Sequence, residues 1–131
     1  MHPDIPNYNR LLEPHFAAVC DLLANEIDAT LPHARSQIWH RHPVWFLDDN
    51  PTVGYSTQKA GIRLMFWSGA DFEEPALNVL GGKFKDASIF YNNASEIASS
   101  DLRRWLGKSM EIRWNYRDIV RKKGLLEKFP A

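Results

Sequence analysis

Apolar residues recur every three or four positions between Pro14 and Leu31, which is the period of one face of an α-helix. Proline is tolerated in the first turn of a helix, because the amide proton that it lacks has no partner there. The pattern therefore predicts a helix over residues 14–31, which Pro32 ends. Residues 1–12 show little periodicity and are predicted to form an N-terminal arm.

Short apolar runs separated by turn-forming residues occupy the middle of the chain, which is typical of consecutive antiparallel strands. The alternation is clearest in GIRLMFW, where Ile62, Leu64 and Phe66 fall on one side of the strand. We predict five strands, near residues 36–40, 43–48, 52–57, 61–67 and 86–91.

The last third of the chain returns to helical spacing, and residues 100–123 are predicted to be helical. Ser99, Ser100 or Asp101 can cap the start of this region. Gly107 lies inside it, so the pattern is compatible with one helix or with two. The apolar positions are Leu102, Trp105, Leu106, Ile112, Tyr116, Ile119 and Val120.

The order of helix, five strands and helix predicts a single α+β domain over residues 1–131. We expect an antiparallel five-stranded meander, with the N-terminal and C-terminal helices packed on one face. The other face would then carry no helix. The chain has more large residues at strand positions than one face absorbs, so some are expected to line an open concavity: Trp39, Trp45, Met65, Trp67 and Tyr91.

The composition fits one ordinary folded domain, with 131 residues of which 44% are hydrophobic. Sixteen basic residues balance sixteen acidic ones, which argues against a chain built mainly to coat nucleic acid or a membrane surface. The charge is uneven, however: residues 101–131 hold nine Lys and Arg against four Asp and Glu. A single cysteine and the absence of any long apolar run predict a cytoplasmic protein.

Four segments resemble a bacterial family of unknown function, the YdhG-like proteins, which are grouped with frataxin-like iron chaperones. They are HARSQIWHRHPVWFLDDNPTVGYS, GIRLMFWSGADFEEPAL, GGKFKDASIFY and SEIASSDLRRWL, and they lie within residues 33–106, a little over half of the chain. The resemblance implies an α+β fold with an antiparallel sheet. It also implies iron binding or delivery, for which carboxylates of the first helix are the expected ligands, and Asp21 and Asp28 share one face of that helix.

A second candidate metal site is the pair His40 and His42, which a regular strand would place on one side. A third donor would have to come from His33, Asp48 or Asp49. The alternative is that Trp39 and Trp45 pack in the sheet while the histidines hydrogen-bond at a strand crossing. We favour the alternative, because no recognised metal-binding motif accompanies the pair.

Catalytic chemistry has few candidates, and we predict a protein that is not an enzyme. Cys20 lies on the apolar stripe of the first helix, where a thiol stays protonated. LGGKFK, at residues 80–85, has glycines that can present backbone amides to an anion, but it reads better as a flexible connection. The basic residues near Trp114 and Tyr116, among them Arg117 and Arg121, suggest single-stranded nucleic-acid binding as an alternative role.

The preferred interpretation is a small binding or accessory domain that uses the helix-free face of its sheet. The ligand would be a small molecule, a peptide or a second copy of the chain in a homodimer. Six residues are the candidates, three for apolar contact and three as polar partners: Trp45, Trp67, Tyr91, His40, Arg63 and Lys83.

Overall fold

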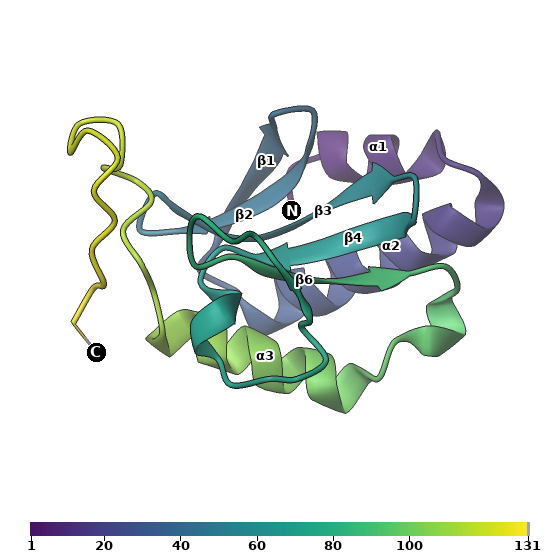
Figure 1. The fold of residues 1–131 in the computed structure, drawn as a ribbon. Coiled ribbons are helices and arrows are strands. Elements are labelled where there is room, and N and C mark those ends of the chain that lie inside the picture. Colours follow the sequence, from purple (N-terminus) through teal and green to yellow (C-terminus); the bar gives the residue numbers. More distant parts are fainter. Residues whose placement is uncertain (131) are drawn as a thin grey trace.

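The chain folds into three α-helices and an antiparallel sheet of six strands, in a computed structural model that describes residues 1–130 (Figure 1). The helices are α1 (Asp4–Arg10), α2 (Pro14–Thr30) and α3 (Ser99–Glu111). The strands are β1 (Arg35–Trp39), β2 (His42–Leu47), β3 (Asn50–Gln58), β4 (Gly61–Phe66), β5 (Val79–Leu80) and β6 (Ala87–Tyr91). The predicted α+β class and antiparallel sheet are confirmed.

The sheet has six strands rather than five, and its order is β1-β2-β3-β4-β6-β5. The additional strand β5 is only two residues long and pairs with Ser88 and Ala87 at one edge. The strand lies within residues 68–85, where no strand was predicted. Two residues are too few to show the alternation that indicates a strand. No helix in the part of the chain that the structure describes is long and apolar enough to cross a membrane.

The predicted N-terminal arm contains a helix, α1. Pro3 is its N-cap residue and Pro6 falls in its first turn, where a proline costs no backbone hydrogen bond. Ile5 of this helix is fully buried, and Asn9 accepts a 2.7 Å hydrogen bond from the hydroxyl of Tyr55. The seven residues of α1 are too few for helical periodicity to be visible in the sequence.

Two successive tight turns connect β1 to β2 and β2 to β3. Their central residues are His40 and Arg41, with φ of 50° and 73°, and Asp48 and Asp49, with φ of 52° and 61°. Positive φ at both central positions is the feature of type I′ turns, whose twist matches that of the strands they join. The predicted strand 36–40 therefore stops at Trp39, and His40 belongs to a turn.

The alternation predicted for β4 is the one observed: Ile62, Leu64 and Phe66 are fully buried, while Arg63 and Met65 are half-buried. On the buried side, the indole Nε1 of Trp45 donates to Asp28 of α2, and the ring of Phe66 lies 6.3 Å from that of Trp105 of α3. In Figure 1, α2 runs behind β4. The apolar side chains of these helices and of the sheet thus form a single buried core.

The predicted C-terminal helix over residues 100–123 is wrong in its second half, because α3 ends at Glu111. The following residues form turns and one isolated bridge between Trp114 and Lys128. Gly107 does not interrupt α3. Residues 112–130, here called the C-terminal segment, leave α3 and extend beyond the end of the sheet (Figure 1).

Candidate functional site

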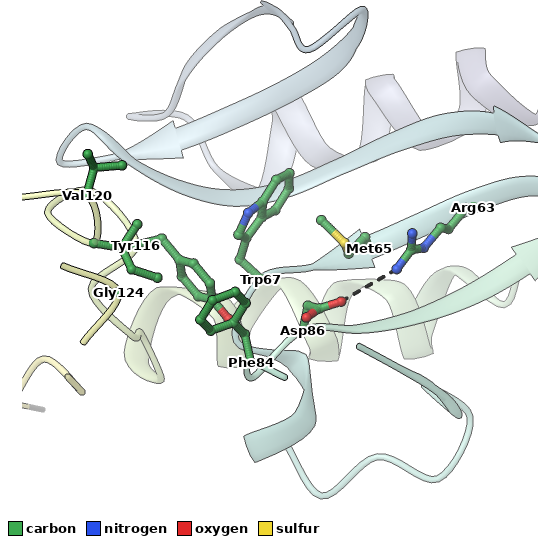
Figure 2. Close-up of a pocket in the computed structure, with 9 residues that line it drawn as sticks. Arg63, Met65, Trp67, Phe84, Asp86, Tyr116, Val120 and Gly124 are labelled. Carbon is green, nitrogen blue, oxygen red and sulfur yellow. Dashed lines mark ion pairs between the residues drawn. The ribbon is translucent and has the colours of Figure 1, made fainter. Parts of the chain in front are cut away.

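A cleft of about 480 Å³ lies against the sheet face that carries Arg63, Met65 and Trp67, and we call it the sheet-face pocket (Figure 2). Its volume lies within the range of roughly 300–1,000 Å³ that is usual for small-molecule sites. Its lining is mostly apolar and comes from β4, from the loop before β6 and from the C-terminal segment. The lining residues are Arg63, Met65, Trp67, Phe84, Asp86, Tyr116, Ile119, Val120 and Gly124.

The floor of the pocket is formed by Met65 of β4 and by Trp67, which directly follows the strand, and both lie on the side opposite to the buried core. The Trp67 indole passes over Gly54 of the neighbouring strand β3. A Cβ atom at Gly54 would lie 3.4 Å from the Trp67 ring and 2.5 Å from the carbonyl oxygen of Pro43. The second contact is closer than side chains tolerate, so only glycine allows β3 to lie this close to Pro43 of β2, while the distance to the indole is an ordinary contact.

Two aromatic rings form the walls next to this floor. Phe84, from the loop before β6, meets Tyr116 of the C-terminal segment edge to face, with ring centroids 6.1 Å apart. The Tyr116 hydroxyl accepts a 2.9 Å hydrogen bond from the backbone N–H of Lys85. Burial raises the pKa of Tyr116 to about 12, so its hydroxyl stays neutral at physiological pH. Val120 closes the outer side and is 89% exposed.

The wall made by the C-terminal segment is held in place by two buried polar side chains. Asn50 donates from Nδ2 to the carbonyl of Trp114 at 3.1 Å and accepts from the N–H of Arg117 at 2.9 Å. The Ser68 hydroxyl accepts from the N–H of Trp114 at 2.9 Å. Asn50 therefore gives this irregular segment the backbone hydrogen bonds that a neighbouring strand would otherwise provide. Because its two partners, Trp114 and Arg117, lie on either side of Tyr116 in the chain, Asn50 also fixes the position of Tyr116.

The polar edge of the pocket is formed by Arg63 and Asp86. Arg63 donates from Nε to the Ser88 hydroxyl at 2.8 Å, and its terminal nitrogen lies 3.5 Å from a carboxylate oxygen of Asp86 (Figure 2). Both side chains are partly accessible, with exposures of 28% for Arg63 and 17% for Asp86. This is the only ion pair between the residues that line the pocket.

A second, smaller hollow of about 80 Å³ adjoins the first and shares Arg63, Met65 and Trp67 with it. It is more polar, and His42, Ser56 and Gln58 also line it. Burial lowers the pKa of His42, so the imidazole is neutral at physiological pH. The Nδ1 atom of His42 is buried and has no hydrogen-bond partner within residues 1–130.

The structure brings together only two of the six predicted ligand-binding residues, Trp67 and Arg63. His40 is exposed in the β1–β2 turn, and Lys83 is exposed beside the Phe84 ring, so neither lines the pocket.

The predicted placement of Trp45 and Tyr91 on the helix-free face is wrong. They are 0% and 3% exposed and belong to the core. The reason is register: Tyr91 pairs with Ile62 and Trp45 with Val53, and both of these partners face the core. Directly paired residues of an antiparallel sheet share a face, so Trp45 and Tyr91 follow their partners inward.

The predicted metal ligands are dispersed. Asp21 accepts a hydrogen bond from Asn9, and Asp28 accepts one from Trp45, so both carboxylates are engaged in joining elements of the fold. His40 and His42 do not occupy one strand, because the first lies in a turn. Within residues 1–130 there is no group of three or more His, Cys, Asp or Glu placed to hold a metal ion.

Cys20 lies where the helical pattern placed it, fully buried in the core. Burial, with a contribution from the charge of Asp21, raises the pKa of the Cys20 thiol to about 12. A thiol in this state is a poor nucleophile at physiological pH.

Several pocket residues were not predicted as site residues, for two reasons. Phe84 lies in the glycine-containing stretch that was interpreted as a connection, and only its aromatic side chain distinguished it. Tyr116, Ile119 and Val120 were identified as apolar but assigned to a helical stripe. Their apolar character was the only feature of the sequence that indicated a site. Because α3 ends at Glu111, these side chains line the pocket instead of packing as one stripe of a helix.

Comparisons of the chain with protein-family models, with curated proteins and with solved structures find no match. The resemblance to the YdhG-like proteins therefore stays a prediction, and the functional argument rests on the geometry of the pocket.

Proposed function

We propose that the protein is a binding domain that holds a small molecule with a flat, apolar body in the sheet-face pocket. The observation that carries this proposal is the cleft itself: a floor of Met65 and Trp67, with Phe84 and Tyr116 as aromatic walls. Aromatic side chains of this kind bury a large area of a flat ligand and prefer stacked or edge-to-face contact.

Part of the proposal is that the three helices shelter one face of the sheet and leave the other to the ligand. It is supported by the contacts of Trp45, Tyr55 and Phe66, all on the buried side, with α2, α1 and α3 respectively. A non-enzymatic role and a cytoplasmic location belong to the same proposal. Iron binding through Asp21 and Asp28 and nucleic-acid binding through Arg117 and Arg121 stay predictions that no contact in the structure favours.

The probe 1-anilinonaphthalene-8-sulfonate tests this function, because its fluorescence rises when its rings leave water. We expect saturable binding of one probe per chain with micromolar affinity, and about tenfold weaker binding by Trp67→Ala, which removes the floor. The matched control is Leu11→Ala, which truncates an apolar side chain that is 87% exposed outside the pocket. Absence of saturable binding, or equal weakening by both variants, would refute the proposal.

A further inference from the structure

The two adjoining hollows differ in polarity in a way that defines the chemistry of a ligand. The larger one is walled by aromatic and aliphatic side chains, whereas the smaller one adds His42, Ser56 and Gln58. Because they share Arg63, Met65 and Trp67, one molecule can occupy both. A volume of about 80 Å³ accommodates a group of a few atoms rather than a ring.

We infer that the ligand of the sheet-face pocket carries an acidic group, which binds beside Arg63 and His42 while its flat body lies on Trp67. This inference rests on the proposed function, and it adds the ligand class: an aromatic or otherwise flat apolar acid. Three further observations support it, and each concerns a different group.

The first is the state of Arg63. A guanidinium has five N–H donors, and the contacts of Arg63 are one hydrogen bond to Ser88 and one ion pair with Asp86 at 3.5 Å. That separation is longer than the 2.7–2.9 Å of a charge-assisted hydrogen bond. Arg63 therefore keeps N–H donors for the carboxylate of a ligand, and the carboxylate of Asp86 competes only weakly for these donors.

The second is the Nδ1 atom of His42, which is buried and lacks a partner within the described chain. Buried polar side-chain atoms are nearly always hydrogen-bonded, so an exception needs a reason. His42 lines the same hollow as Arg63, so a polar group bound there can supply this atom with its missing partner.

The third is the charge around the pocket. Lys83 and Lys85 flank the wall residue Phe84 in the loop before β6. Lys123 directly precedes Gly124, which also lines the pocket. Cationic side chains thus belong to both segments that form the walls, which favours the approach of an anion.

A matched pair of probes, 1-naphthaleneacetic acid and 2-(1-naphthyl)ethanol, separates the acidic group from the flat body. By calorimetry we expect the acid to bind about tenfold more tightly than the alcohol, which is the usual contribution of one hydrogen bond to a charged group. Arg63→Gln should reduce this preference to within about twofold. Asp86→Asn, which removes the competing carboxylate, should increase it, and this second variant keeps the test informative if Arg63→Gln folds poorly.

The outcomes distinguish the two proposals. If both probes bind wild type equally, or if Asp86→Asn leaves the preference unchanged or lower, the acidic-ligand inference is overturned while the pocket remains a binding site. If a well-folded Arg63→Gln variant keeps the full preference, the inference is overturned too. If neither probe binds, the proposed function fails, and the inference fails with it.

Discussion

Single residues hold distant parts of this molecule together, and Glu74 is the clearest case. Its carboxylate is only 8% exposed and receives hydrogen bonds from Arg104, Trp105 and Lys108, all on α3. These partners, Arg104 first, hold the pKa of Glu74 well below its usual range. Glu74 therefore attaches the connection between β4 and β5 to the last helix, a role that nothing in its local sequence indicates.

We expect Glu74→Gln to lower the free energy of unfolding by about 2 kcal/mol at pH 7, because it removes charged hydrogen bonds from a buried site. In the folded protein the pKa of the Glu74 carboxyl lies well below its ordinary value of 4.5. The ionised carboxylate therefore stabilises the fold fully above pH 4.5, and this stabilisation is lost as the pH falls below 4.5. The difference between wild type and variant should thus shrink at pH 3 in urea unfolding. Glu73→Gln, at the exposed neighbour, should change little, and a difference independent of pH would contradict this account.

At the scale of elements, the sequence predicted the strands and turns more accurately than it predicted the last helix. The turn-forming residues Asp48 and Asp49 marked the β2–β3 turn correctly. The identities of His40 and Arg41 did not predict a turn, because neither residue type is among those that favour positive φ most strongly. The register of β1 and β2 imposes that conformation on them, so the backbone there is strained.

Arg41→Gly tests this strain. Arg41 is exposed with φ of 73°, a conformation that glycine adopts without steric cost, so the variant should be more stable by about 0.5–1 kcal/mol. Urea unfolding measures the change. The control is Lys59→Gly in the exposed β3–β4 turn, where φ is not positive and glycine should be neutral or destabilising. Equal effects of the two substitutions would argue against strain at Arg41.

At the scale of the whole molecule, the pocket depends on contacts between residues far apart in the chain. Trp67 of the floor, Phe84 of one wall and Tyr116 of the other come from three separate segments. The sequence pattern supplied the floor, because alternation along β4 places Arg63, Met65 and Trp67 on one side. The Tyr116 wall depends on where the C-terminal segment lies, and Asn50 and Ser68 hold this segment through hydrogen bonds to its backbone.

Asn50→Ala should therefore release the C-terminal segment without unfolding the core. We expect faster tryptic cleavage between residues 113 and 123, where several Arg and Lys lie, together with weaker binding of 1-anilinonaphthalene-8-sulfonate. Asn92→Ala is the matched control, because the Asn92 side chain also donates to a backbone carbonyl, that of Ala60, at another turn. If cleavage and probe binding were the same in both variants, Asn50 would not hold the C-terminal segment in place.

Taken alone, the sequence determined the α+β class, the antiparallel sheet, the helix from Pro14 and the two sides of β4. Each of these follows from periodicity within one segment, which local geometry alone dictates. Tertiary structure decided which side Trp45 and Tyr91 take, because pairing register relates one strand to the next. It also decided that α3 ends at Glu111, since the contacts of Trp114 with Asn50 and Ser68 replace the helical hydrogen bonds that apolar spacing alone would predict.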